Sequence, residues 1–193
     1  MFFPYKDDNP RILVPYVTYG IIGLNILIFL FQVGLGQTNQ NLILHFGLIP
    51  AHWSLISLFT SMFLHGGFAH LLGNMWFLWL FGDNVESALG HVRYLIFYFL
   101  CGIGAAVAQT TINLDSTIPM VGASGAISGV LAAYMIQYPK ARVHVFMFLF
   151  IFFTTFRVPA FVVIGFWFLE QLTNGLGSIG LDISGGVAWF AHI

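Results

Sequence analysis

The sequence predicts an all-α, polytopic membrane protein, a bundle of about six transmembrane helices. Of its 193 residues, 59% are hydrophobic and only 7% are charged, against about 25% charged residues in soluble domains. The mean hydropathy of +0.89 points the same way. The net charge of -1 comes with only six Lys and Arg residues, so nucleic-acid binding is excluded, because phosphate neutralisation needs clustered cations. We therefore expect the protein to be embedded in a lipid bilayer.

The first apolar run predicts a retained transmembrane helix over residues 13–35. Residues 1–11 before it form a short polar tail, and we expect a single domain over residues 12–193. The run is longer than the hydrophobic part of a signal peptide, which spans about 7–15 residues, and it has no clear small-residue cleavage site.

The second apolar run, residues 42–81, is too long for one crossing of a bilayer that needs about 20 helical residues. His65, Gly66 and Gly67 interrupt it. We expect the part before this break to lie in the membrane interface or dip into one leaflet. The part after it, residues 68–81, is predicted to be a short second span, followed by a polar loop over residues 82–93.

The remaining spans follow from the same length rule. The break at Tyr138 and Pro139 ends the fourth span, because proline does not continue a helix comfortably, and the aromatic stretch 143–156 is assigned to the interface. The last apolar run stops at Ile193 after about half a span, so we expect the sixth helix to be truncated. The predicted helices cover 94–108, 123–138, 159–174 and a segment from about 183.

The positive charges agree with this six-span topology. Lys and Arg are enriched in short cytoplasmic loops, and with the N-terminus inside, every Lys and Arg falls on the inner side. These are Lys6, Arg11, Arg93, Lys140, Arg142 and Arg157. The sequence therefore predicts an integral membrane protein with a cytoplasmic N-terminus, and its short loops favour a prokaryotic plasma membrane.

Polar residues are costly inside a membrane, so each one is a functional candidate. The first is Ser124, at the predicted start of the fourth span between Gly122 and Gly125. Small neighbours allow a substrate backbone to approach, and the free N–H groups of a helix N-terminus can hold a negative oxygen. Small residues at this spacing, such as Gly125 and Gly129, more commonly indicate close helix packing.

The second candidate is His192, in the last apolar run after Gly185 and Gly186. A serine hydroxyl needs an adjacent base to act as a nucleophile, and imidazole is the commonest. In the predicted topology Ser124 and His192 both lie in the outer half of the membrane. The alternative is a histidine that only pairs with a polar group of another helix.

The third candidate group is His65, His70 and Asn74. The last two are four residues apart and so share one face of a helix. Both donate hydrogen bonds while neutral, as an oxyanion hole inside a membrane requires. The competing interpretation, a metal site, is disfavoured because there is no HExxH pattern and no nearby carboxylate in the outer half. We therefore expect neither a metal nor an organic cofactor.

The acidic residues favour a Ser–His dyad over a triad, because none is an obvious partner for His192. Glu170 is predicted to contact a loop near the outer end of the fifth helix. The others are assigned to the inner side (Asp7, Asp8, Asp83, Glu86) or to outer loops (Asp115, Asp182).

Taken together, these motifs resemble the rhomboid intramembrane proteases over residues 12–193. The resemblance implies a six-helix bundle in which Ser124 is the nucleophile and His192 the general base. It implies an oxyanion hole made by His70, Asn74 and the Ser124 N–H, supported by His65, Gly122 and Gly125. The fifth helix and its outer loop would be a substrate gate.

One departure from the family concerns Ser128, where some members have an aromatic residue stacked on the histidine. The function expected from the resemblance is a serine endopeptidase that cleaves transmembrane proteins near the outer face. The alternatives are a catalytically inactive relative that binds membrane proteins, and a channel or small transporter.

Overall fold

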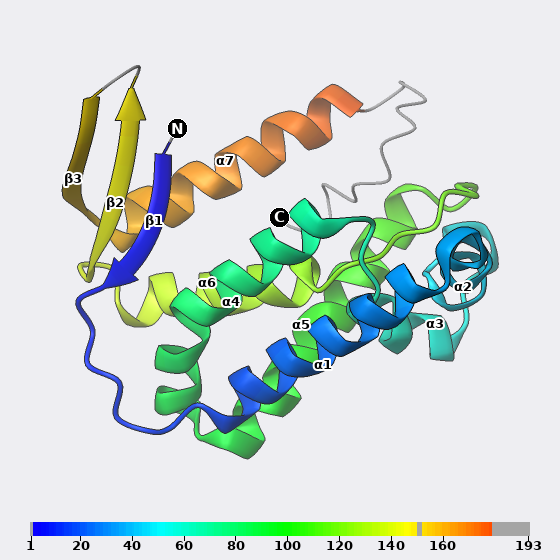
Figure 1. The fold of residues 1–193 in the computed structure, drawn as a ribbon, viewed down its shortest axis with the longest axis horizontal. Coiled ribbons are helices and arrows are strands. Elements are labelled where there is room, and N and C mark those ends of the chain that lie inside the picture. The colour runs from blue at the N-terminus through cyan, green and yellow to red at the C-terminus, as the bar shows by residue number, and fades with distance from the viewer. Residues whose placement is uncertain (1, 150–151, 179–193) are drawn as a thin grey trace.

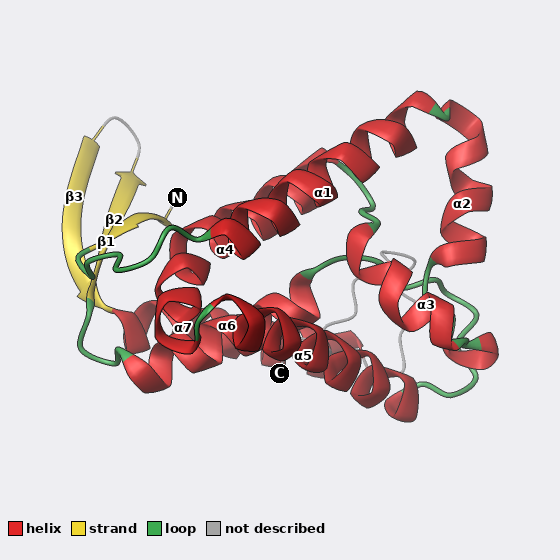
Figure 2. Cartoon of the chain, turned by 90° about the horizontal axis from the view of Figure 1, so that it is seen from below, coloured by secondary structure: helices red, strands yellow, loops and turns green. Residues whose placement is uncertain are grey.

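A computed structural model describes residues 2–149 and 152–178. Most of this part is helical, and short 3-10 turns join several of the helices. The predicted helical membrane bundle is confirmed (Figures 1 and 2). The helices are α1 (Tyr16–Gly34), α2 (Asn39–Phe46), α3 (Leu55–Thr60), α4 (Phe68–Leu89), α5 (His91–Ile112), α6 (Ser124–Gln137) and α7 (Ala160–Ser178). The strands are β1 (Phe2–Asp7), β2 (Arg142–Leu149) and β3 (Phe152–Pro159).

Within the described residues, α1 and α5 are long and apolar enough to cross a membrane on their own. A third span forms if Leu55–Phe63 and α4 are counted together, although their axes differ by 89°. This bend lies at the predicted break around His65. Helix α6 and the first ten residues of α7, Ala160–Leu169, are shorter apolar helices. The predicted sixth helix lies outside the described residues.

The sequence interpretation contained no strands, yet the structure has a three-stranded antiparallel sheet in the order β1-β2-β3. The predicted N-terminal tail is therefore part of the fold, and the aromatic stretch 143–156 is a hairpin. Val143 and Val145 alternate inward and are fully buried, which is the pattern of a half-buried strand. The strand β1 is fixed to the bundle by the Tyr134 hydroxyl, which donates to Asp7 at 2.5 Å.

The predicted polar loop over residues 82–93 is wrong. Helix α4 continues to Leu89 and α5 begins at His91, with Gly90 at φ 77° between them. The helix continues because its polar side chains find partners there. Asn84 donates to Asp7 at 3.1 Å, and Glu86 accepts hydrogen bonds from the start of α1.

Small residues allow α5 and α6 to pack closely. A Cβ atom on Gly129 would overlap Cys101 of α5, and one on Gly102 would overlap the side chain of Met62. The packing interpretation of the glycine pattern is thus correct for Gly129.

All six Lys and Arg residues lie at one end of the bundle, together with the sheet. They belong to β1, to the segment before α1, to the start of α5, to the turn after α6, and to β2 and β3. Helix α6 begins at Ser124 and runs towards this end, so Ser124 lies in the other half of the bundle, nearer α2 and α3 (Figure 1).

Candidate active site

Ser124 is the first residue of α6, and it lines a cavity of about 40 Å³. This is room for water, which hydrolysis requires. The serine is half-buried. Five other residues of the lining matter for the argument, namely Ser61, Met62, His70, Gly122 and Gly125.

The segment before Ser124 is held by backbone hydrogen bonds to the long segment between α2 and α4. Leu48 and Met120 exchange two of them, at 3.0 and 2.8 Å, and Gly122 N–H donates to the Ser61 carbonyl at 2.9 Å. These bonds fix the chain just before the α6 N-terminus. Together they hold Ser124 at the edge of the cavity.

Gly122 has to be glycine for two reasons. Its φ of +129° is in a region that other residues rarely adopt. A Cβ atom there would also lie only 2.8 Å from Cε1 and Nε2 of His70, and 3.6 Å from Nδ2 of Asn74. Both α4 side chains therefore reach the backbone two residues before Ser124.

Asn74 carries a buried donor that has no partner among the described residues. The residue is only 8% exposed, and its Nδ2 has no hydrogen bond among the described residues. A buried polar group left unpaired costs about 1–3 kcal/mol, so such groups are rare and call for an explanation. One explanation is that such a donor binds a negatively charged oxygen in a transition state.

His65 lies behind this pair. It is 1% exposed, and its ring meets the His70 ring edge to face with centroids 5.2 Å apart. On its other side it meets Phe29. Neither ring nitrogen of His65 has a hydrogen-bond partner within the described part of the chain. His65 therefore packs against the ring of His70.

Gln32 of α1 is a residue that the sequence interpretation missed. Its side-chain amide pairs with both backbone groups of His65, accepting from N–H at 3.0 Å and donating to the carbonyl at 3.2 Å. The residue is 1% exposed. It fixes the turn between the bent segment and α4, from which His70 projects. A polar residue inside an apolar span is the signal that could have found it.

The structure thus brings together Ser124, Gly122, His70 and Asn74, with Gly125 in the same cavity lining and His65 one layer behind. His192 and the side chain of Glu170 lie outside the described residues. Ser128 has a structural explanation, since its hydroxyl donates to the Ser124 carbonyl at 2.8 Å. The chemical roles of the site residues remain predictions.

Four of the described acidic residues lie away from this site, while Asp115 lies in the segment between α5 and α6. Asp7, Asp8, Asp83 and Glu86 lie at the end that carries the sheet. In residues 2–149 and 152–178, no group of three or more His, Cys, Asp or Glu side chains is arranged to hold a metal ion.

Comparisons with known proteins give a consistent result. The family model described as "Rhomboid domain" matches residues 52–193. Rhomboid protease GluP of Bacillus subtilis is 35% identical over 89% of this chain and 34% of its own length. Rhomboid protein 1, mitochondrial, of Saccharomyces cerevisiae is 30% identical over 76% of this chain and 42% of its own. The human presenilin-associated rhomboid-like protein, mitochondrial, is 32% identical over 64% of this chain and 33% of its own. The chain therefore spans well under half the length of these relatives.

Proposed function

This chain belongs to the rhomboid family and is an integral membrane protein, and from this premise we propose that it is an intramembrane serine endopeptidase. The observation that carries the proposal is the meeting of three groups at one cavity. Ser124 lines it, and His70 and Nδ2 of Asn74, which has no partner in the described structure, both reach Gly122 beside it. A nucleophile next to two neutral donors is the arrangement that acyl transfer needs.

In the proposed reaction, His192 takes the proton of the Ser124 hydroxyl as its oxygen attacks the carbonyl carbon of the scissile peptide. The carbonyl oxygen becomes negative and is held by His70, Asn74 and the Ser124 N–H. His192 then gives its proton to the leaving amine. Water from the cavity hydrolyses the acyl-enzyme, so no metal or organic cofactor takes part.

The proposed substrates are transmembrane proteins, cleaved in or beside a membrane-spanning segment. The site lies in the half of the bundle opposite the cationic end. If that end faces the cytoplasm, as cationic loops favour, cleavage occurs near the outer face. We assign the protein to a prokaryotic plasma membrane with its N-terminus inside. Helix α7 is the proposed substrate gate.

The experiment that tests this proposal is labelling of the purified protein with a fluorophosphonate, which reacts with activated serines. We expect labelling of the wild type and none of Ser124→Ala, together with loss of cleavage of a helical substrate down to background. Ser128→Ala is the matched control, because Ser128 lies one turn further along α6 and bonds only to backbone in the described structure. It should retain labelling.

Two outcomes contradict the proposal. Labelling that persists in Ser124→Ala would place the reactive serine elsewhere. A wild type that neither reacts with the probe nor cleaves any helical substrate, but still binds one, would be an inactive relative that acts as a membrane-protein binder.

A further inference from the structure

The strand β1 is bonded to the two helices that supply the proposed catalytic groups. Helix α4 carries His70 and Asn74, and helix α6 begins at Ser124. Side chains of both helices form hydrogen bonds with β1 or with the residue pair that follows it. The strand also pairs with β2, so it joins the sheet to the helix bundle.

The contacts with α4 lie near both ends of β1. Near the start of the strand, Nε1 of Trp76 donates to the Pro4 carbonyl at 2.7 Å, and the Trp76 ring packs against Phe3 with centroids 4.7 Å apart. At its end, Nδ2 of Asn84 donates to Asp7 at 3.1 Å. Trp76 and Asn84 are eight residues apart, so β1 is fixed to α4 at two points roughly 12 Å apart along the helix.

The contact with α6 is made by Tyr134, which is fully buried. Its hydroxyl donates to Oδ2 of Asp7 at 2.5 Å and accepts from Nδ2 of Asn9 at 2.9 Å. The same Asp7 oxygen accepts from Asn84, so one carboxylate oxygen receives a donor from α4 and a donor from α6. Hydrogen bonds to an ionised acceptor are about twice as strong as neutral ones. Asp7 therefore ties the two helices together.

Apolar packing between α4 and α6 does not replace these bonds. The Phe81 and Tyr134 rings pack with centroids 4.8 Å apart, but apolar contacts allow one helix to slide along the other, whereas hydrogen bonds are directional. In a bilayer the lipid tails are as apolar as the side chains, so interhelical hydrogen bonds contribute to holding helices together. A shift of about 1 Å between catalytic groups can lower the rate on the order of 10²-fold.

We propose that β1 is a clamp that holds α4 and α6 at the relative position that catalysis requires. Trp76 lies two residues after Asn74, and Tyr134 lies ten residues, roughly 15 Å of helix, after Ser124. A displacement of either helix at the strand therefore moves the oxyanion donors relative to the nucleophile. Trp76, Asn84 and Tyr134 are positioning residues, and the inference rests on the proposed function.

Two conservative changes test the clamp in the full chain. Trp76→Phe and Tyr134→Phe each remove one donor to β1 and keep an aromatic ring. The matched controls are Trp79→Phe and Tyr138→Phe. Their rings pack against Trp76 and Tyr134 with centroids 5.4 and 5.3 Å apart, but neither residue forms a hydrogen bond with β1 in the described part of the chain. Turnover of a helical substrate per folded molecule is measured together with hydrogen exchange of the β1 amides.

We expect each clamp variant to exchange its β1 amides several-fold faster than the wild type. Its kcat should fall by about 10-fold, as a partial misplacement of the catalytic groups predicts, with KM nearly unchanged, while both controls keep wild-type values. Because both donors act through one strand, the double variant should lose less than the product of the two single losses. Fast exchange of β1 with a wild-type kcat would overturn the clamp, and so would equal losses in the variants and their controls.

The distance between α4 and α6 provides a measurement that does not depend on proteolysis. Cys101 is the only cysteine, so spin labels are attached to cysteines at Leu72 of α4 and Ile136 of α6, both exposed, in a Cys101→Ala background. Tyr134→Phe should broaden the distribution of distances between the labels. A broadened distribution in a protein that cleaves no substrate would support the clamp and contradict the proposed function. An unchanged distribution would overturn the clamp alone.

Discussion

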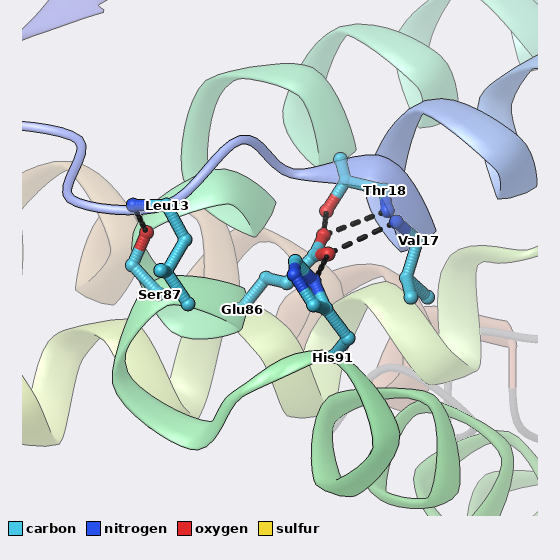
Figure 3. Close-up of polar contacts among 6 residues, drawn as sticks. All are labelled: Leu13, Val17, Thr18, Glu86, Ser87 and His91. Carbon is cyan, nitrogen blue, oxygen red and sulfur yellow. Dashed lines mark hydrogen bonds and ion pairs between the residues drawn. The ribbon is translucent and has the colours of Figure 1, made fainter.

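Glu86 and Asn74 lie in the same helix, α4, roughly 18 Å apart along its axis. Both side chains are buried, but they differ in their hydrogen-bond partners. The carboxylate of Glu86 accepts from the N–H groups of Val17 and Thr18 at 2.9 and 2.8 Å, and from the Thr18 hydroxyl at 2.7 Å. It also lies 2.6 Å from Nδ1 of His91 (Figure 3). The Nδ2 of Asn74 has no partner among the described residues.

The difference separates two uses of a buried polar group. Glu86 satisfies the free N–H groups at the start of α1, where a negative charge is favourable, and so ties α1 to α4. The Asn74 Nδ2 is a donor without a partner among the described residues, so it adds no stabilising hydrogen bond there. The comparison predicts that changes at Glu86 affect stability and that changes at Asn74 affect catalysis.

The largest effect is expected from Asn74→Ala. Losing one oxyanion donor lowers kcat by about 10²–10³-fold. The melting temperature should hardly change, because Nδ2 has no hydrogen bond to lose within the described part of the chain. Turnover of a helical substrate and thermal unfolding in detergent micelles check the two halves of this prediction.

Asn25→Ala is the matched control for Asn74→Ala. Asn25 is a fully buried asparagine of α1 whose Nδ2 donates to the Ile21 carbonyl. Its change should affect stability and leave kcat of the folded protein close to wild type. An Asn74→Ala protein with wild-type kcat would remove Asn74 from the proposed oxyanion hole.

Glu86→Gln should have the opposite profile. The neutral amide cannot accept from all the donors that converge on Glu86, so buried N–H groups at the start of α1 lose their partners. The free energy of unfolding should fall by about 3 kcal/mol, with kcat of the folded fraction nearly unchanged. Denaturant unfolding followed by tryptophan fluorescence measures this loss.

The control for Glu86→Gln is the next residue in the chain. The Ser87 hydroxyl accepts from Leu13 N–H at 3.2 Å at an exposed position (Figure 3). Ser87→Ala should therefore cost less than about 1 kcal/mol. Equal losses for the two variants would show that the buried carboxylate has no special part in joining α1 to α4.

The same contrast explains what the sequence could and could not predict. Ser124, His70 and Asn74 are polar residues in apolar runs, and their spacing on α4 and at the start of α6 is visible in the sequence. The region of Glu86 looked like a polar loop, because its partners belong to a segment 69 positions earlier in the chain. Helix propensity and hydropathy contain no information about such pairing.

The sheet was missed for a related reason. Residues 146–153 lack the alternation that identifies a half-buried strand, since both faces are apolar. The partner strand β1 comes from a polar segment about 140 residues earlier. Its pairing with β2 is again a long-range contact that local patterns do not show.

Gln32→Leu tests whether α1 positions the site from a distance. The change removes both hydrogen bonds to the His65 backbone, so the turn before α4 can shift and move His70. Misplacement of a catalytic group by about 1 Å costs on the order of 10²-fold, and we expect kcat to fall by about 10–100-fold with little change in KM. Steady-state kinetics separate the two constants.

A second buried glutamine provides the control for Gln32→Leu. Gln109 of α5 is 6% exposed, and its Oε1 has no partner in the described structure. Gln109→Leu should keep a kcat near that of the wild type. If the two leucine variants lose kcat equally, or if Gln32→Leu changes only the melting temperature, Gln32 has no positioning role.

The smallest effect is expected at the exposed surface of the sheet, where Asp8 pairs with His144. The hydrogen bond from His144 holds the pKa of Asp8 below its usual value. A lowered pKa in the folded state means that the pairing stabilises the sheet above the unfolded pKa of about 3.9, and that this stabilisation is lost as the pH falls through the folded value. Hydrogen exchange of the β1 amides reports on it. Asp8→Asn should exchange faster than the wild type at pH 6, and the two proteins should converge at low pH, where the wild-type carboxyl is protonated.

Arg157→Gln is the control for Asp8→Asn. Arg157 lies 3.9 Å from Asp8, and its change leaves the bond between Asp8 and His144 intact, so its effect should be smaller. A difference between Asp8→Asn and the wild type that persisted below the folded pKa could not come from the charge of Asp8, and the hairpin would then owe nothing to this pair.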